Sequence, residues 1–285
     1  MTRLLPDHQA SNNRHLDDIG SDDPLLSSTF TCRSVDPKVL FFVRIPKCAS
    51  TSFVEQLRGW SKKGQFELFF HPSGAFDWDI RTIKKVASQV NAKQSKRFVY
   101  ARHFYYTDFR MYGVEDYSYL TIIRDPVSRF ISSFLYYHYS SKAHIQSLLN
   151  PKHKNETLLE CIEHQHEGCA HNWLTKYFCG HDRFCKLGNE QALKIAKENL
   201  LRDFTAVGIL EEMDLSMSLF ETLLPGYFKA AGREKLPQTN KNEQSLQRLS
   251  SSEEAAIRSA NKADIELYNF ARTVFHKTSK ACKLT

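Results

Sequence analysis

Short apolar runs alternate with longer amphipathic stretches along most of the chain. The runs are continuous, as in strands that are buried on both faces of a sheet, and they cover residues 39–43, 98–101, 119–123 and 205–210. The spacing of apolar residues predicts helices over 50–57, 127–139, 191–201, 215–228 and 251–275, the fourth ended by Pro225-Gly226. Buried strands that alternate with helices predict an α/β fold with a parallel central sheet flanked by helices.

Residues 1–36 do not share this pattern. They are rich in Asp, Ser, Asn and His, which predicts a polar stem or disordered arm. Residues 37–285 contain no internal repeat, so we expect one domain there. No run of about 18 apolar residues, the length that crosses a bilayer, occurs in the sequence, and the first residues lack the apolar segment of a signal peptide.

Four of the seven cysteines crowd between Cys161 and Cys185. Their gaps do not match the closely paired ligands of a structural zinc site. Two local disulfides, Cys161–Cys169 and Cys179–Cys185, explain the clustering in an oxidising compartment, and four buried reduced thiols are the alternative. The sequon Asn155-Glu156-Thr157 predicts glycosylation at Asn155 and agrees with the secretory pathway. Since no targeting signal is visible, we expect a type II membrane anchor that this sequence does not contain; entry by a signal that the sequence does not make visible is the alternative.

The charge balance is basic. Lys and Arg number 39 against 32 Asp and Glu, which gives a formal net charge of +7. Such a surface suits a polyanionic partner, and charge alone does not separate nucleic acids, phosphorylated ligands and sulfated sugars.

A candidate anion-binding loop follows the first predicted strand. In Arg44-Ile-Pro-Lys-Cys-Ala-Ser-Thr-Ser52, Lys47 supplies a positive charge. Ser50, Thr51 and Ser52 supply hydroxyl groups and backbone N–H groups at the start of a helix, where anions bind readily. A nucleotide kinase would have Gly-x4-Gly-Lys at this place, and those glycines are absent. The alternative is a capped helix with an incidental lysine.

A second candidate lies in Ile122-Ile-Arg-Asp-Pro-Val-Ser-Arg-Phe-Ile-Ser-Ser133. Arg124 stands at a strand tip, and Ser132 lies two turns into the following helix. Two anion sites on adjacent strand ends suit a nucleoside that carries phosphate groups at both ends. A helix-start ion pair between Asp125 and Arg129 is the alternative for this segment.

Together these segments resemble the two binding elements of sulfotransferases that use 3′-phosphoadenosine 5′-phosphosulfate (PAPS). The sequence is most similar to the uronyl 2-O-sulfotransferases of heparan sulfate and of dermatan or chondroitin sulfate. The resemblance spans about residues 39–275 and includes Tyr100-Ala-Arg-His-Phe104 and Phe178-Cys-Gly-His-x3-Cys185. It implies a parallel α/β sheet related to that of P-loop nucleotide kinases, and it implies the same two local disulfides.

The resemblance also implies roles for individual residues. The 5′-phosphosulfate would be surrounded by Lys47, Cys48, Ala49, Ser50, Thr51 and Ser52. Lys47 would stabilise the leaving oxygen, and Arg124 with Ser132 would hold the 3′-phosphate. His103 matches the base that takes the proton from the uronic acid 2-hydroxyl, and Arg44 matches a substrate-contacting arginine. The segment Thr239–Asn242 would cover the nucleotide.

The sequence departs from the heparan sulfate enzymes at two places. Cys48 replaces a threonine, and a thiol at a helix start is expected to have a lowered pKa and to react with thiol reagents. Ala101-Arg102-His103 replaces His-Gly-His, as in the dermatan/chondroitin branch, so His103 would act as the base alone. The alternative for His103 is a structural histidine that is hydrogen-bonded beside the sheet.

The sequence therefore predicts a Golgi-lumenal uronosyl 2-O-sulfotransferase with a glycosaminoglycan acceptor. We expect no nucleic acid partner, no metal in the reaction, and a homotrimer as the family suggests. His71 and the basic stretch Lys142, Lys152, His153 and Lys154 are candidates for acceptor contacts. Two alternatives remain: a degenerate module that binds sulfated polysaccharide without turnover, and a nucleotide or small-molecule kinase.

Overall fold

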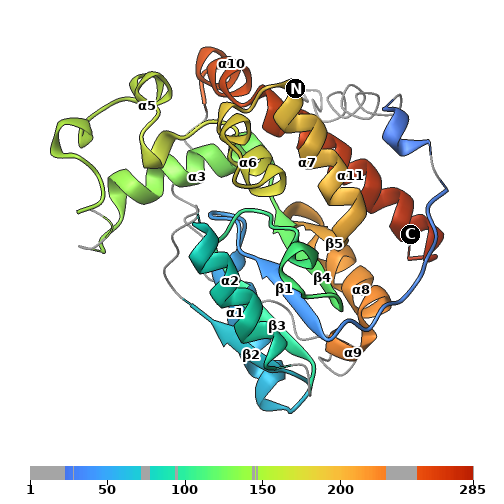
Figure 1. Cartoon of the computed structure of the whole chain (residues 1–285). Coiled ribbons are helices and arrows are strands. Elements are labelled where there is room, and N and C mark those ends of the chain that lie inside the picture. Colours follow the sequence, from blue (N-terminus) through green and yellow to red (C-terminus); the bar gives the residue numbers. More distant parts are fainter. Residues whose placement is uncertain are drawn as a thin grey trace, which may run out of the picture.

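The computed structural model of the chain contains a five-stranded, wholly parallel sheet in the order β2-β3-β1-β4-β5 (Figure 1). It describes residues 23–27, 29–71, 78–93, 96–142, 145, 147–228 and 249–284. The strands are β1 (Val39–Val43), β2 (Glu67–Phe70), β3 (Phe98–Arg102), β4 (Tyr117–Ile123) and β5 (Phe204–Ile209). The parallel α/β sheet predicted from the sequence is confirmed. The strand that the sequence missed, β2, has four half-buried residues at the edge of the sheet.

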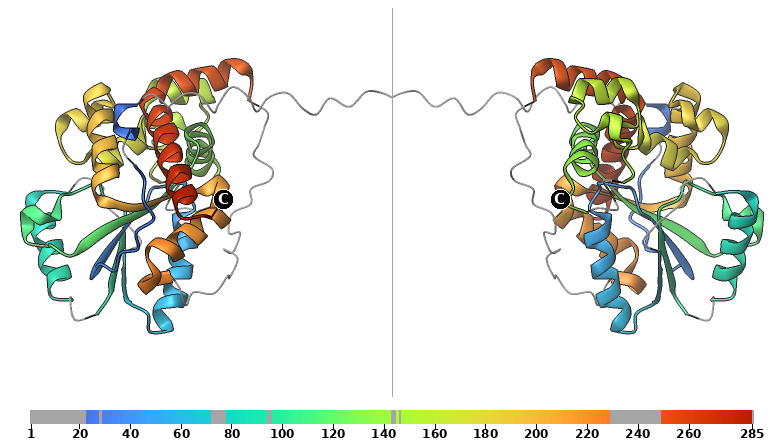
Figure 2. Two further views of the ribbon diagram at one scale, coloured as in Figure 1. Left: turned by 90° about the vertical axis from the view of Figure 1, so that its right-hand side faces the viewer. Right: turned by 90° about the vertical axis from the view of Figure 1, so that its left-hand side faces the viewer.

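Helices cover both faces of this sheet. The helices are α1 (Ser50–Lys62), α2 (Ile80–Asn91), α3 (Pro126–Tyr139), α5 (Leu158–His164), α6 (Trp173–Cys179), α7 (Glu190–Asp203), α8 (Met213–Leu223), α9 (Pro225–Phe228), α10 (Ser251–Ala260) and α11 (Lys262–Ala281). Helix α1 lies with α8 and α9 on one face, and α2 lies on the other (Figure 2).

The central strand β1 supplies apolar side chains to both layers. Phe42 contacts Phe53 of α1, with ring centroids 4.8 Å apart, and Phe53 in turn contacts Phe220 of α8 at 6.0 Å. On the opposite face, Phe41 stacks on Phe109 at 4.4 Å and on Tyr119 at 5.3 Å. Successive residues of a strand point to opposite faces, so a continuous apolar run fills two cores at once.

Two predicted helices are interrupted in the structure. Pro225 begins the separate short helix α9 rather than ending a helix that runs from 215 to 228. The C-terminal prediction is divided at Asn261, which is fully buried and accepts a hydrogen bond from the Asn172 N–H through its side chain. Asp264 then accepts hydrogen bonds from the Leu174 and Thr175 N–H groups. The break allows two buried polar side chains to join α11 to the start of α6.

Part of the predicted stem packs on the domain. Leu26 is 2% exposed, its carbonyl accepts a hydrogen bond from Lys277 of α11 at 2.9 Å, and Cys32 forms a disulfide with Cys282. Asp23 pairs with Lys197 of α7 at 2.8 Å. The part of the chain that packs on the domain therefore begins before residue 37, at least as early as residue 23, and residues 1–22 lie outside the described part.

The cysteines are paired as the local spacing predicted. The structure contains the disulfides Cys161–Cys169 and Cys179–Cys185, with Cα atoms 5.4 and 5.5 Å apart. It also contains Cys32–Cys282, which the sequence did not reveal, and Cys48 is the free cysteine. Among the described residues, no helix is both long enough and apolar enough to cross a bilayer.

The Cys32–Cys282 disulfide is expected to stabilise the domain strongly. Its partners are 250 positions apart, and on the chain-entropy model a loop of that size contributes about 5 kcal/mol. We predict that Cys32→Ser and Cys282→Ser each lower the free energy of unfolding in urea by about 3–5 kcal/mol. The double variant should lose no more than either single variant, because all three lack the same bond. An unchanged free energy of unfolding would contradict this prediction.

Candidate active site

The carboxyl ends of β1, β3 and β4 meet at one edge of the sheet. Val43 at the end of β1 lies beside Arg102 of β3 and Thr121 of β4. The chain leaves β1 toward β2 on one side and leaves β4 toward β5 on the other (Figure 1). Such a switch point leaves a crevice at the strand ends, where α/β proteins bind ligands.

The loop between β1 and α1 has the backbone of an anion-binding turn. Lys47 and Ala49 both adopt left-handed conformations, with φ of 69° and 55°. This backbone costs a non-glycine residue about 1 kcal/mol or more, and it recurs where consecutive N–H groups surround an anion. Ala49 is the N-cap of α1 and provides no side-chain cap, so a bound anion would complete this helix end. Ser50 and Ser52 are buried, and Thr51 is exposed.

Lys47 and Arg124 lie close together, as the two motifs predicted. The Lys47 ammonium lies 3.8 Å from the ring centroid of Tyr136 on α3. Burial and the charge of Arg124 lower the pKa of Lys47 to about 8. Within the described structure no carboxylate forms an ion pair with Lys47. Two neighbouring cations are suited to hold an anion between them.

Helix α3 begins directly after Arg124. Asp125 caps it by accepting a hydrogen bond from the Ser128 N–H at 2.8 Å. Among the described residues, Asp125 and Arg129 do not form the alternative ion pair. Arg129 is instead 2% exposed, and its guanidinium lies 5.9 Å from the ring centroid of Trp173. Ser132, half-buried, follows on the same helix. Arg124 and Ser132 therefore both follow the carboxyl end of β4, Arg124 directly and Ser132 on helix α3.

His103 follows β3 and contacts the loop after β1. Its Nδ1 lies 2.5 Å from the carbonyl oxygen of Arg44. A carbonyl only accepts, so Nδ1 carries the hydrogen, and in the neutral ring Nε2 keeps its lone pair. Burial and the charge of Arg44 lower the pKa of His103 to about 4. This is the tautomer and the charge state that a general base requires near neutral pH.

Arg44 lies beside His103 as a buried cation. It is 4% exposed, its guanidinium donates to the His71 carbonyl at 3.2 Å, and its Nε has no hydrogen-bond partner among the described residues. The same group lies 4.7 Å from the ring centroid of Phe70. Burial lowers the pKa of Arg44 to about 10. A buried guanidinium with an unused donor is suited to an acidic ligand group.

The lowered pKa expected for the Cys48 thiol is wrong. The side chain is fully buried, with Sγ 3.7 Å from the Pro46 carbonyl. Burial raises the pKa of the Cys48 thiol to about 12, although Arg129 and Arg124 favour the thiolate. The cysteine points into the protein, where the cost of desolvating a thiolate exceeds the effect of the helix start.

Other predicted residues are exposed or lie beyond the described part. The segment Thr239–Asn242 lies outside the described residues. Lys142, Lys152 and Lys154 are exposed, and Asn155 is exposed in the turn before α5. The sequence missed the contact between Lys47 and Tyr136, because periodicity assigned Tyr136 to a helix face without indicating what lies opposite.

Comparison with known proteins is consistent with this geometry. The chain is 29% identical to the heparan sulfate 2-O-sulfotransferase hst-2 of Caenorhabditis elegans over 202 residues, 68% of this chain and 62% of that protein. It is 30% identical to heparan sulfate 2-O-sulfotransferase 1 of Gallus gallus over 69% of this chain and 57% of that protein. It is 31% identical to the uronyl 2-sulfotransferase of Mus musculus over 68% of this chain and 50% of that protein.

The chain thus spans between half and about three fifths of the length of these relatives. The family model described as "Sulfotransferase family" matches residues 32–271, which include every strand of the sheet and the loops at its carboxyl edge. The chain therefore belongs to the sulfotransferase family.

Proposed function

We propose that this chain is the catalytic domain of a PAPS-dependent uronosyl 2-O-sulfotransferase that acts on a glycosaminoglycan in the Golgi lumen. The observation that carries the proposal is the neutral His103, held by the Arg44 carbonyl at the sheet edge where Lys47 and Arg124 lie. A base next to two cations that form no ion pair with any described carboxylate fits attack on an anionic donor. The relatives named as heparan sulfate and uronyl 2-sulfotransferases support the choice of acceptor.

In this proposal each residue has one chemical task. Nε2 of His103 takes the proton of the uronic acid 2-hydroxyl as that oxygen bonds to sulfur. The bond from sulfur to the bridging phosphate oxygen breaks, and the electron pair stays on that oxygen, where the Lys47 ammonium stabilises it. The loop over 48–52 holds the 5′-phosphate, and Arg124 with Ser132 holds the 3′-phosphate. Arg44 contacts the acidic acceptor. No step needs a metal ion.

The alternative of a degenerate binding module has little left to favour it. It was motivated by Cys48 and by the absence of a second histidine before His103. Cys48 is buried, with its side chain directed away from solvent, and His103 has the tautomer of a base without help from another histidine.

The proposed activity is tested with sulfate-labelled PAPS and a panel of desulfated heparan, dermatan and chondroitin polymers, followed by disaccharide analysis. We expect label at the 2-hydroxyl of a uronic acid in at least one polymer. Label found only on glucosamine or galactosamine, or on no polymer while the protein is folded, would overturn the proposal.

Replacement of His103 should separate catalysis from nucleotide binding. In His103→Asn the amide nitrogen can still donate to the Arg44 carbonyl, while the basic nitrogen is lost. We predict a fall in kcat of about 10²–10⁴-fold, with affinity for 3′-phosphoadenosine 5′-phosphate changed by no more than a few fold. His276→Asn on α11 serves as the control and should retain activity. An active His103→Asn enzyme would exclude His103 as the base.

The pKa directions define a pH window for kcat/KM, which reports the free enzyme. His103 is neutral above its lowered pKa of about 4, and Lys47 is charged below its lowered pKa of about 8. We predict a plateau between these values, with activity lost as His103 is protonated at lower pH and as Lys47 is deprotonated at higher pH. Lys47→Arg should move only the alkaline limb upward, since arginine stays charged. An acid limb near pH 6.5 would contradict this prediction.

Cys48 should resist alkylation in the folded enzyme. We predict that iodoacetamide at pH 8 leaves Cys48 unmodified and activity unchanged, because the thiol is buried and its pKa is raised to about 12. After denaturation in urea without reductant, mass spectrometry should find one alkylated cysteine, Cys48. Alkylation of Cys48 in the native state would contradict this prediction and would show that the loop between β1 and α1 opens.

A further inference from the structure

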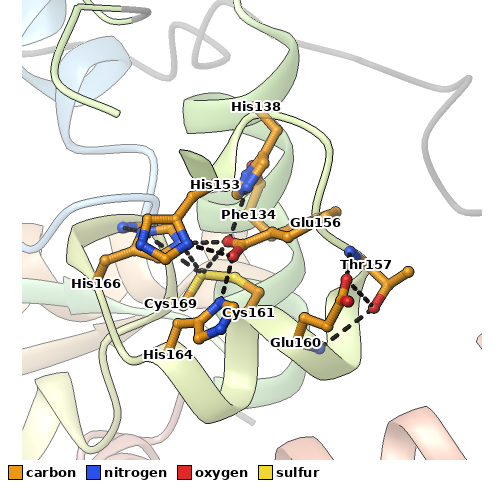
Figure 3. The surroundings of a disulfide bond; sticks show 11 residues. Phe134, His138, His153, Glu156, Thr157, Glu160, Cys161, His164, His166 and Cys169 are labelled. Carbon is orange, nitrogen blue, oxygen red and sulfur yellow. Dashed lines mark hydrogen bonds and ion pairs between the residues drawn. A yellow bond between two sulfur atoms is a disulfide. The ribbon is translucent and has the colours of Figure 1, made fainter. Parts of the chain in front are cut away.

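Four histidines surround the carboxylate of Glu156, apart from the residues assigned to sulfate transfer (Figure 3). His138 lies near the end of α3, His153 ends the 3-10 helix over 151–153, His164 ends α5, and His166 precedes the 3-10 helix over 167–169. The side chain of Glu156 is 3% exposed, and that of His138 is 1% exposed. Four segments of the chain therefore bring ligand-type atoms to one buried carboxylate.

The histidines divide between the two carboxylate oxygens. Nδ1 of His153 and Nδ1 of His164 lie 2.9 and 2.7 Å from Oε2 of Glu156. Nε2 of His138 lies 3.0 Å from Oε1, and Nε2 of His166 contacts the same oxygen. The ligand atoms of His153, Glu156 and His164 all lie within 4.8 Å of one another, as do those of His138, Glu156 and His166.

The hydrogen bonding of His138 requires a positive charge in this cluster. Its Nδ1 lies 2.8 Å from the carbonyl oxygen of Phe134, so Nδ1 must donate. In the neutral ring Nε2 then has only a lone pair, and this lone pair faces a carboxylate oxygen of Glu156. Two lone pairs at that distance repel unless a second proton or a metal ion lies between them. Histidines that bind metals typically donate their other N–H to a backbone carbonyl, as His138 does.

We propose that Glu156 and its four histidines form a binding site for one divalent transition-metal ion of the zinc class. Imidazole nitrogen and carboxylate oxygen are common zinc ligands, at about 2.0–2.2 Å from the ion. A tetrahedral ion needs four ligands. Glu156 with two histidines supplies three of them in either group, and a water molecule can supply the fourth. The side chain of His164 is 45% exposed, so an ion can enter from solvent.

The surrounding covalent structure fixes the proposed site before an ion binds. Cys161 on α5 and Cys169 are joined in a disulfide, so their sulfur atoms are not ligands. This bond holds α5, which carries His164, against the turn that carries His166. An ion would add a link from this turn to His138 on α3, the helix that also carries Ser132 and Tyr136. Its role would be structural, distinct from the transfer reaction.

The test is zinc binding by the whole chain after treatment with a chelator, measured by calorimetric titration and by metal analysis after dialysis. We expect one zinc ion per chain and a higher melting temperature with zinc than with EDTA. His153→Ala/His164→Ala should weaken zinc binding by at least 100-fold, and His164→Ala alone by about tenfold or more. Both positions are at least partly exposed, so these variants are expected to fold.

The matched control is His276→Ala, because the His276 side chain is 41% exposed against 45% for His164 and also faces a glutamate, Glu212. This variant should bind zinc as the wild type does. No zinc binding by the wild type, or equal affinity in His153→Ala/His164→Ala, would overturn the proposal and leave protonated histidines as the charge that Glu156 pairs with. Neither readout depends on sulfate transfer.

Discussion

The parallel pairing of β1 on both sides is the constraint on which the rest of the structure depends. The ladder continues beyond the strand, because the Arg44 N–H donates to the Arg102 carbonyl at 2.9 Å. On the other side, the Thr121 hydroxyl donates to the Val43 carbonyl at 2.8 Å. A strand fixed on two sides and buried on both faces cannot shift its end. The loop after β1, His103 after β3 and Arg124 after β4 therefore keep fixed relative positions.

Two features of the loop after β1 and its surroundings lower the stability of the protein: buried positive charge and backbone strain. Arg44 and Lys47 are cations whose charged forms are disfavoured by their surroundings, and the loop holds two non-glycine residues at positive φ. Features that destabilise a protein without a ligand are typical of binding sites, where the ligand offsets the cost. The buried aromatic layers on both faces of β1 stabilise the domain enough to offset this strain and buried charge.

The sequence predicted the features that are local in the chain. The apolar runs became strands, and the two motifs with Lys47 and Arg124 came together because parallel strands end at one edge. It missed what depends on packing between distant segments. The Cys32–Cys282 disulfide joins the two ends of the fold, Asn261 divides a helix to reach Asn172, and burial reverses the pKa shift expected for Cys48. Nothing in the sequence grouped the histidines around Glu156, of which His153 was a candidate for acceptor contacts; the fold of the segment over 150–169 brings them together.

We propose that the loop after β1 and the tip of β4 together hold one ligand with phosphate groups at both ends. Calorimetric titration with 3′-phosphoadenosine 5′-phosphate tests it most directly. Lys47→Ala and Arg124→Ala should each weaken binding by about tenfold or more, as expected for the loss of a charge-assisted contact, and Lys280→Ala, at an exposed position of α11, should not. Binding that is absent from the wild type, or unchanged in both variants, would contradict the claim.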